Sequence, residues 1–168
     1  MLDGAPISSA LSGLVMDMIQ RQAFRAYLSS MRAPRGRQLN AYERVALDAV
    51  CSQLDCDRVR IEEGGGNLIL LFTEGITLGN TIYMRESAYS IDFLAHELTH
   101  VMQYQAWGGF EYYVRALGAR VRDVFGDPYH VDFPLDRPFD AYGMEQQATI
   151  VQLCYLRVGA ACRSFFGR

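Results

Sequence analysis

The stretch Phe93-Leu94-Ala95-His96-Glu97-Leu98-Thr99-His100-Val101-Met102 decides how this chain is interpreted, because it contains an H-E-x-x-H motif. Residues four positions apart lie on one face of an α-helix, so His96 and His100 can reach the same metal ion. Glu97 can stand beside that ion without binding it and accept a proton from a bound water. The motif therefore predicts a zinc-dependent hydrolase, most naturally a peptidase.

The residues around the motif predict a helix from about residue 90 to 106. Ser87 and Ser90 are candidate N-caps, and Gly108-Gly109 provides a stop signal. Between these signals, residues that would bury one stripe of the helix recur with a helical period: Ile91, Leu94, Leu98, Val101, Met102 and Gln105. The competing interpretation is an ordinary helix with two histidines four apart by accident. It is weakened because two of the chain's three histidines fall in the motif.

Length and composition describe an ordinary globular protein. With 168 residues, half of them hydrophobic, we expect residues 1–168 to form a single domain with a sizeable core. The net charge is −3 and no basic block is present, so nucleic acid and membrane are not expected partners. The sequence has neither a membrane-spanning apolar run nor the positive start of a secretory signal. We expect a cytoplasmic protein, or one exported by a secretion system that reads no N-terminal signal.

The chain has four cysteines, at Cys51, Cys56, Cys154 and Cys162, and no two of them form a C-x-x-C pair. We expect buried thiols that pack as small hydrophobic side chains, rather than disulfides or a second metal site. Their pattern assigns them no function.

The remaining segments predict an α+β protein, mainly helical, with a small β-sheet before the motif helix. An N-terminal helical part is expected over about residues 8–54, made of an amphipathic segment at 8–31 and a helix with Asn40 and Glu43 as its capping box. Strands are expected over about residues 58–84, at Arg58–Ile61, Asn67–Phe72 and Asn80–Met84. The last of these could bind an extended substrate by strand addition.

Two more helices are expected after the motif, over Phe110–Phe125 and about residues 144–166. A Pro- and Asp-rich loop of roughly fifteen residues separates them, and loops of that length are often functional.

A catalytic zinc site needs a third protein ligand and one position open to water. Glu145 is the favoured third ligand, because the first turn of a long helix would hold it rigidly. The alternative is that Glu145 has no functional role and is simply an acidic residue at a helix N-terminus, where the helix macrodipole favours negative charge. His130 is the other candidate, and the loop offers weaker carboxylates: Asp127, Asp132, Asp136 and Asp140.

With Glu145 as the ligand, three loop residues become candidates for stabilising negative charge on a substrate's carbonyl oxygen. They are His130, Tyr129 and Tyr142, and each could equally be an ordinary surface residue. Zinc lowers the pKa of its bound water to about 7, and Glu97 would accept the proton.

Three blocks of the sequence resemble a zincin-like group of bacterial proteins: Thr77–Tyr83, His96–Gln105 and Phe139–Ala148. Members of the group are labelled Vgr-related proteins, or zinc-metallopeptidase-like domains associated with contractile injection and type VI secretion systems. Asn40–Ile61 is also similar, so the resemblance covers about residues 38–156. It leaves out the N-terminal helices and the C-terminus.

The resemblance implies a gluzincin-like fold in which His96, His100 and Glu145 bind Zn²⁺ and Glu97 is the general base. It also implies an association with secretion machinery, without naming a substrate. The first function to consider is a metallopeptidase that cleaves peptide or protein substrates. The alternative is a catalytically silent adaptor of zincin-like fold that binds a spike or effector protein of the secretion system. A third is a scaffold with an empty or structural metal site, but a structural site would need four protein ligands.

Overall fold

The computed structural model describes residues 36–64, 73–123, 127 and 129–157, together with 17, 18 and 21. The predicted strand at 67–72 and the end of the predicted last helix therefore lie outside the described residues. The same holds for the predicted segment at 8–31, apart from the three residues just given.

The first described helices are α2 (Ala41–Ala46) and α3 (Asp48–Cys51). The predicted capping box is confirmed: the Asn40 side chain accepts a hydrogen bond from the Glu43 backbone, and the Glu43 carboxylate accepts one from the Asn40 backbone. Arg37 and Tyr89 also donate to this buried carboxylate, at 2.8 and 2.7 Å. The start of α2 is thereby tied to the segment just before the motif helix.

Cys51 and Cys56 form a disulfide across the turn that follows α3, so the expectation of free buried thiols was wrong. Their Cα atoms are 5.5 Å apart, a normal separation for a disulfide. This proximity arises because α3 ends at Cys51 and a 3₁₀ turn, η1 (Cys56–Arg58), folds back. Cys154 is disulfide-bonded as well.

Within the described residues, the sheet has three strands, β1 (Arg60–Glu63), β2 (Gly75–Leu78) and β3 (Thr81–Met84), in the order β1-β3-β2. β1 is parallel to β3, and β2 is antiparallel to it across a two-residue turn. That turn begins at Gly79, whose φ of 67° favours glycine. The prediction that the strand at 80–84 could receive a substrate was wrong, because β3 is the central strand. The edge beside the motif helix belongs to β2.

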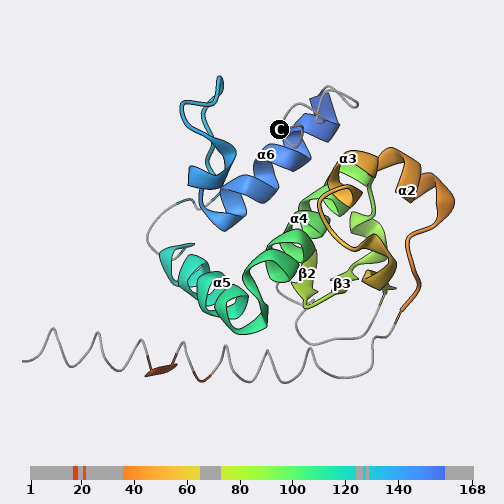
Figure 1. Cartoon of the computed structure of the whole chain (residues 1–168), viewed down its shortest axis with the longest axis horizontal. Coiled ribbons are helices and arrows are strands. Elements are labelled where there is room, and N and C mark those ends of the chain that lie inside the picture. Colours follow the sequence, from red (N-terminus) through yellow and green to blue (C-terminus); the bar gives the residue numbers. More distant parts are fainter. Residues whose placement is uncertain are drawn as a thin grey trace, which may run out of the picture.

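The motif helix α4 (Ile91–Trp107) runs through the middle of the molecule, between the sheet and the last helix (Figure 1). The prediction for this helix is confirmed: Ser90 caps its start by accepting a hydrogen bond from the Phe93 backbone, and it ends at Gly108. Its apolar stripe joins residues of the sheet and the other helices in one buried core: Val50, Val59, Ile61, Ile82, Met84, Leu94, Leu98, Val101 and Val151. The motif is thus on a rigid, buried helix.

Three elements follow α4: the helix α5 (Gly109–Asp123), the 3₁₀ turn η4 (Phe139–Ala141) and the helix α6 (Met144–Arg157). α6 packs along α4 on the side away from the sheet (Figure 1). The structure is therefore mixed α+β with a small sheet before the motif helix, as predicted. Within the described residues, no helix has the length and apolar character needed to cross a membrane.

Candidate metal centre

Three buried or nearly buried side chains meet where α4 and α6 face each other: His96, His100 and Glu145. The two histidines lie on successive turns of α4, with ring centroids 5.0 Å apart. Glu145 comes from the first turn of α6 and places one carboxylate oxygen 3.6 Å from His96 Nε2 and 3.3 Å from His100 Nε2. All three potential ligand atoms lie within 4.8 Å of one another. The two helices therefore aim their donors at one point.

This donor set fits a zinc ion. Two imidazole nitrogens and one carboxylate oxygen are a ligand set of catalytic zinc sites. Ligand atoms bound to one tetrahedral zinc at about 2.0–2.1 Å lie roughly 3.3–3.4 Å apart. The two distances to Glu145, 3.3 and 3.6 Å, are of this size. The fourth position of such an ion would remain for water or substrate.

The charges of the three residues favour a cation between them. Burial has the largest effect on His100 and lowers its pKa, but the charge and hydrogen bond of Glu145 outweigh it, and the pKa is raised to about 9. Burial likewise raises the pKa of Glu145, whereas His100 and His96 lower it to well below its usual range. At neutral pH the metal-free site therefore holds a proton on His100 against the carboxylate of Glu145. A bound dication would replace that proton.

Strand β2 holds Glu97, the acidic residue of the motif. The Thr77 hydroxyl donates to Glu97 Oε2 at 2.8 Å and lies 3.1 Å from the Glu97 carbonyl oxygen. Glu97 Oε1 lies against Gly75: a Cβ added there would sit 2.9 Å from this oxygen and 2.8 Å from the Phe93 ring. Glu97 thus has a fixed place beside the two histidines and is not part of the three-residue donor cluster.

A cavity of about 800 Å³ opens beside these residues. The cavity is lined by β2 and the segment before it, and by the mainly apolar face of α5 that carries Tyr112, Tyr113, Ala116 and Leu117. The outer edge of β2 faces this cavity: Glu74 bonds to Arg85 of the sheet, so by antiparallel alternation the backbone groups of Gly75 and Thr77 point the other way. The Tyr112 hydroxyl donates to the Thr77 carbonyl at 3.3 Å. The Thr73 hydroxyl donates to the Gly75 carbonyl at 2.8 Å, so both outward-facing carbonyls of β2 accept a hydrogen bond from within the chain.

The structure separates the three loop residues that were candidates for charge stabilisation. Tyr129 lines the large cavity, with its ring centroid 6.4 Å from that of His96. The His130 side chain is 66% exposed, bonds to Asp132 at 3.2 Å and does not line this cavity. Tyr142 lies elsewhere, with its hydroxyl donating to Asp136 at 2.8 Å. Of the three, the structure brings only Tyr129 to the histidines.

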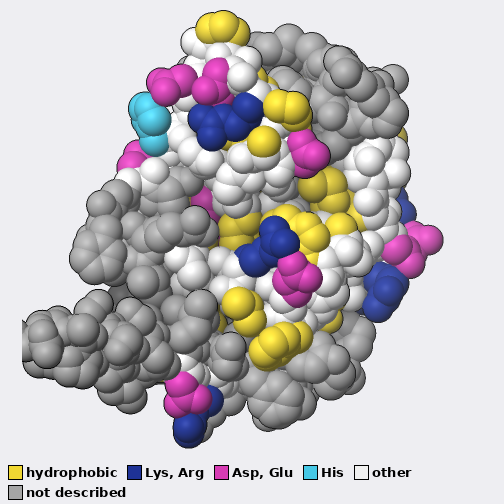
Figure 2. Space-filling view, turned by 60° about the vertical axis from the view of Figure 1, so that its left-hand side comes forward, with side chains coloured by type: hydrophobic (Ala, Val, Ile, Leu, Met, Phe, Trp, Pro, Cys, Tyr) yellow, Lys and Arg dark blue, Asp and Glu magenta, His cyan; other side chains and the backbone are white. Residues whose placement is uncertain are grey.

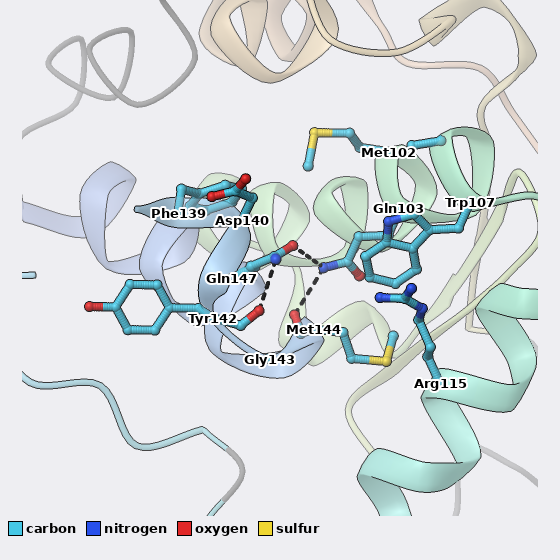
Figure 3. Close-up of a pocket in the computed structure, with 11 residues that line it drawn as sticks. Met102, Gln103, Trp107, Arg115, Phe139, Asp140, Tyr142, Gly143, Met144 and Gln147 are labelled. Atoms are coloured by element: carbon cyan, nitrogen blue, oxygen red, sulfur yellow. Dashed lines mark hydrogen bonds between the residues drawn. The ribbon is translucent and has the colours of Figure 1, made fainter. Parts of the chain in front are cut away.

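Two buried glutamines that sequence reasoning missed connect His100 to the first turn of α6, which carries Glu145. Gln103 accepts from His100 Nδ1 at 2.9 Å and donates to Gln147 at 2.9 Å and to the Met144 carbonyl at 3.0 Å. Gln147 in turn donates to the Tyr142 carbonyl at 2.9 Å (Figure 3). The position of Gln103, three residues after His100 on the same helix, was a detectable signal. Gln147 had none, because its partner belongs to another helix.

These glutamines line a second cavity of about 320 Å³, which shares the lining residue Met144 with the large one. Its walls include Trp107, which carries the Arg115 guanidinium 4.4 Å above its ring, and Met144 at the start of α6 (Figure 3). On the face shown in Figure 2, basic and acidic side chains lie next to one another among hydrophobic ones. Two ion pairs lie close in the sequence to lining residues of the second cavity: Arg115 with Glu111, and Arg137 with Asp136.

Comparison with known proteins bears on the family and the fold. Residues 52–108 match the family model of the eCIS core domain, a segment that includes the whole sheet and α4 but ends before Glu145. The fold is similar to that of the effector domain of Pseudomonas aeruginosa VgrG2b, with a TM-score of 0.67, 21% sequence identity and 93% of each chain covered. No curated protein matched the sequence. The family match agrees with the predicted similarity to a group associated with contractile injection, and the structural match shows a likeness of fold.

Proposed function

We propose that this chain is a zinc-dependent hydrolase of peptide bonds, with a zincin-like fold, and that it serves as an effector of a contractile injection or type VI secretion system. One observation carries the proposal. His96, His100 and Glu145 converge within reach of one ion, and Glu97 is held beside them at the wall of a large cavity. The similarity to the VgrG2b effector domain supports the link to secretion.

The residues of the site have distinct tasks in this reaction. A bound zinc ion would polarise the scissile carbonyl and lower the pKa of a water molecule. Glu97, oriented by Thr77, accepts the proton of the attacking water and can pass it to the leaving amine. The outer edge of β2 binds the substrate as an extended strand. The apolar face of α5 receives one of its hydrophobic side chains, since that face lines the same cavity.

The test is metal content and proteolysis of the purified protein. We expect one zinc per chain and cleavage of fluorescein-labelled casein. Glu97→Gln should keep the zinc and reduce cleavage by at least about 100-fold, the lower end of what general base catalysis contributes. A wild type without stoichiometric zinc, or equal cleavage by both proteins, would refute the proposal.

An adaptor function is the second candidate, and one observation favours it. The family match ends at residue 108 and so includes the sheet and α4 without the proposed third ligand. An adaptor of this kind would bind a secretion-system spike protein through the matched part and would need no hydrolysis. A pull-down with such a spike protein separates the two, because an adaptor retains both binding and biological effect in the Glu97→Gln variant.

The Cys51–Cys56 disulfide supports a place of action outside the reducing cytoplasm. Disulfides persist in oxidising compartments and are rare in cytosolic proteins. We therefore infer that the chain is exported, as expected for an effector that a secretion system delivers.

A further inference from the structure

We propose that Gln103 is the positioning residue that assembles the metal centre from two helices. The inference rests on the proposed zinc site and assigns a task to a residue that binds no metal itself. Gln103 lies on α4, one turn after His100, and its side chain is almost completely buried, with 2% exposed. Its three hydrogen bonds go to a ligand on its own helix and to the start of the other helix.

The direction of these hydrogen bonds is determined by backbone carbonyls. The carbonyl oxygens of Tyr142 and Met144 can only accept, so each requires an amide nitrogen in front of it. Gln147 must therefore turn its nitrogen to Tyr142 and its oxygen to Gln103. Gln103 must then turn its nitrogen to Gln147 and Met144 (Figure 3). Only its oxygen is left for His100. No flipped arrangement of either amide satisfies the same partners.

This direction sets the form of one ligand. Because the oxygen of Gln103 accepts from His100 Nδ1, that ring nitrogen carries a hydrogen. Nε2 is then the nitrogen available to a metal, and it is the one that faces Glu145 at 3.3 Å. His96 lacks such help, since no described residue gives its buried Nδ1 a hydrogen-bond partner. Gln103 therefore acts on one histidine specifically.

The same amide sets the place of another ligand. Met144, whose carbonyl accepts from Gln103, directly precedes Glu145 in the first turn of α6. Gln147 adds a second bond to the same turn. One side chain on α4 thus orients His100 and anchors the turn that carries Glu145. Two of the three ligands depend on it.

The matched control is Gln105, two residues further along α4. Its side chain also joins α4 to other parts of the chain: it accepts from the Asp55 backbone at 2.7 Å and donates to Asn80 at 2.7 Å. No hydrogen bond of Gln105 given by the structure goes to a metal ligand. Replacing either glutamine with methionine removes the hydrogen bonds of an amide that is buried in Gln103 and half-buried in Gln105. If Gln103 had a purely structural role, both variants would therefore lose stability and zinc affinity to a similar extent.

The experiment measures zinc affinity of the full chain by competition with a chromophoric chelator, alongside thermal unfolding of the metal-free proteins. We expect Gln103→Met to bind zinc about 10- to 100-fold more weakly than wild type, as is usual when an outer-sphere partner is lost. Gln105→Met should unfold at a lower temperature and keep wild-type affinity. Equal affinity in Gln103→Met and wild type, or an equal loss in Gln105→Met, would overturn the inference.

Two further variants keep the test decisive if Gln103→Met does not fold. Gln147→Met leaves Gln103 its bonds to His100 and Met144, so we expect a smaller loss of zinc affinity in the same direction. Gln103→Glu keeps an acceptor for His100 but places a carboxylate against two oxygens of α6. Wild-type affinity in Gln103→Glu would contradict the anchoring of α6.

A readout without metal completes the design. In ¹⁵N-labelled metal-free protein, the Nδ1 hydrogen of His100 should be protected in wild type and in Gln105→Met but not in Gln103→Met. The two proposals fail in different ways. A wild type that takes up no zinc refutes the proposed function and this inference together. A wild type that binds zinc as tightly as Gln103→Met refutes this inference alone.

Discussion

The two sides of α4 contribute to the site in different ways. On the sheet side, β2 contacts Glu97 through the Thr77 hydroxyl and the backbone of Gly75. On the other side, α6 supplies Glu145 and is bound by Gln103. The sheet thus holds the proposed base, and the last helix completes the proposed metal site. We therefore expect that substitutions on the sheet side disturb the proposed chemistry, whereas substitutions on the α6 side disturb metal binding.

The largest effect is expected on the α6 side. Glu145→Ala removes the proposed third ligand, so we expect zinc affinity to fall by more than the roughly 100-fold that loss of an outer-sphere partner can cost. His130→Ala is the control, because this exposed side chain lies away from the donor cluster, and it should keep full zinc occupancy. Metal analysis after gel filtration measures both. Retained zinc in the first variant and lost zinc in the second would exchange the roles of the two residues.

The second prediction concerns pH and the same side of α4. Because the pKa of His100 is raised to about 9, zinc must displace a proton from it at any lower pH. We expect zinc affinity to rise by about tenfold per pH unit up to about pH 9 and then to level off, with release of about one proton at pH 7. Calorimetry in two buffers of different ionisation enthalpy counts the protons. Release of none would show that His100 is neutral in the metal-free site.

The third prediction addresses the β2 side. Thr77→Val removes the hydroxyl that orients Glu97, so we expect kcat to fall by about tenfold while KM and zinc content stay as in wild type. A hydrogen bond to a charged group contributes about 1.5 kcal/mol at the low end, which corresponds to this factor. Thr77→Ser restores the hydroxyl and should recover most of the rate. Loss of zinc from Thr77→Val would mean that the two sides are not independent.

The smallest effect is expected at the substrate edge of β2. The Tyr112 hydroxyl donates a hydrogen bond at 3.3 Å to the Thr77 carbonyl, the same acceptor that an extended substrate would use. Tyr112→Phe frees this acceptor, so we expect KM to fall by about twofold with kcat unchanged, in line with one weak hydrogen bond. Steady-state kinetics with a peptide identified from the casein digest provides the measurement. A higher KM would indicate that the substrate uses the hydroxyl itself.

Local sequence patterns predicted the parts of the fold whose determinants are local. The capping box at Asn40, the extent of α4 and the first residue of α6 each depend on neighbouring residues, and each was found. β2 was missed, because Gly75-Ile76-Thr77-Leu78 is short, begins with glycine and is followed by another. Its strand conformation depends on pairing with β3.

In the candidate site, too, the features that depend on local sequence were predicted and those that depend on distant contacts were not. Spacing placed His96 and His100 on one helix face, and helix position singled out Glu145. The partners of these residues could not be predicted, since the Thr77 and Gln147 contacts join segments that are far apart in the chain. The choice between Tyr129 and His130 likewise depends on the path of a loop, which no periodicity describes. The Cys51–Cys56 disulfide was missed because two cysteines five residues apart can form a bridge here only if the helix ends at Cys51, as α3 does.

The close approach of Gly75 to Glu97 has an evolutionary consequence. Any larger residue at position 75 would press against the Glu97 carboxylate and the Phe93 ring, while the three metal ligands would keep their partners. A single codon change could therefore turn a hydrolase of this architecture into a binding protein that still carries its ion. On this proposal, descent from enzyme to adaptor would need one step here.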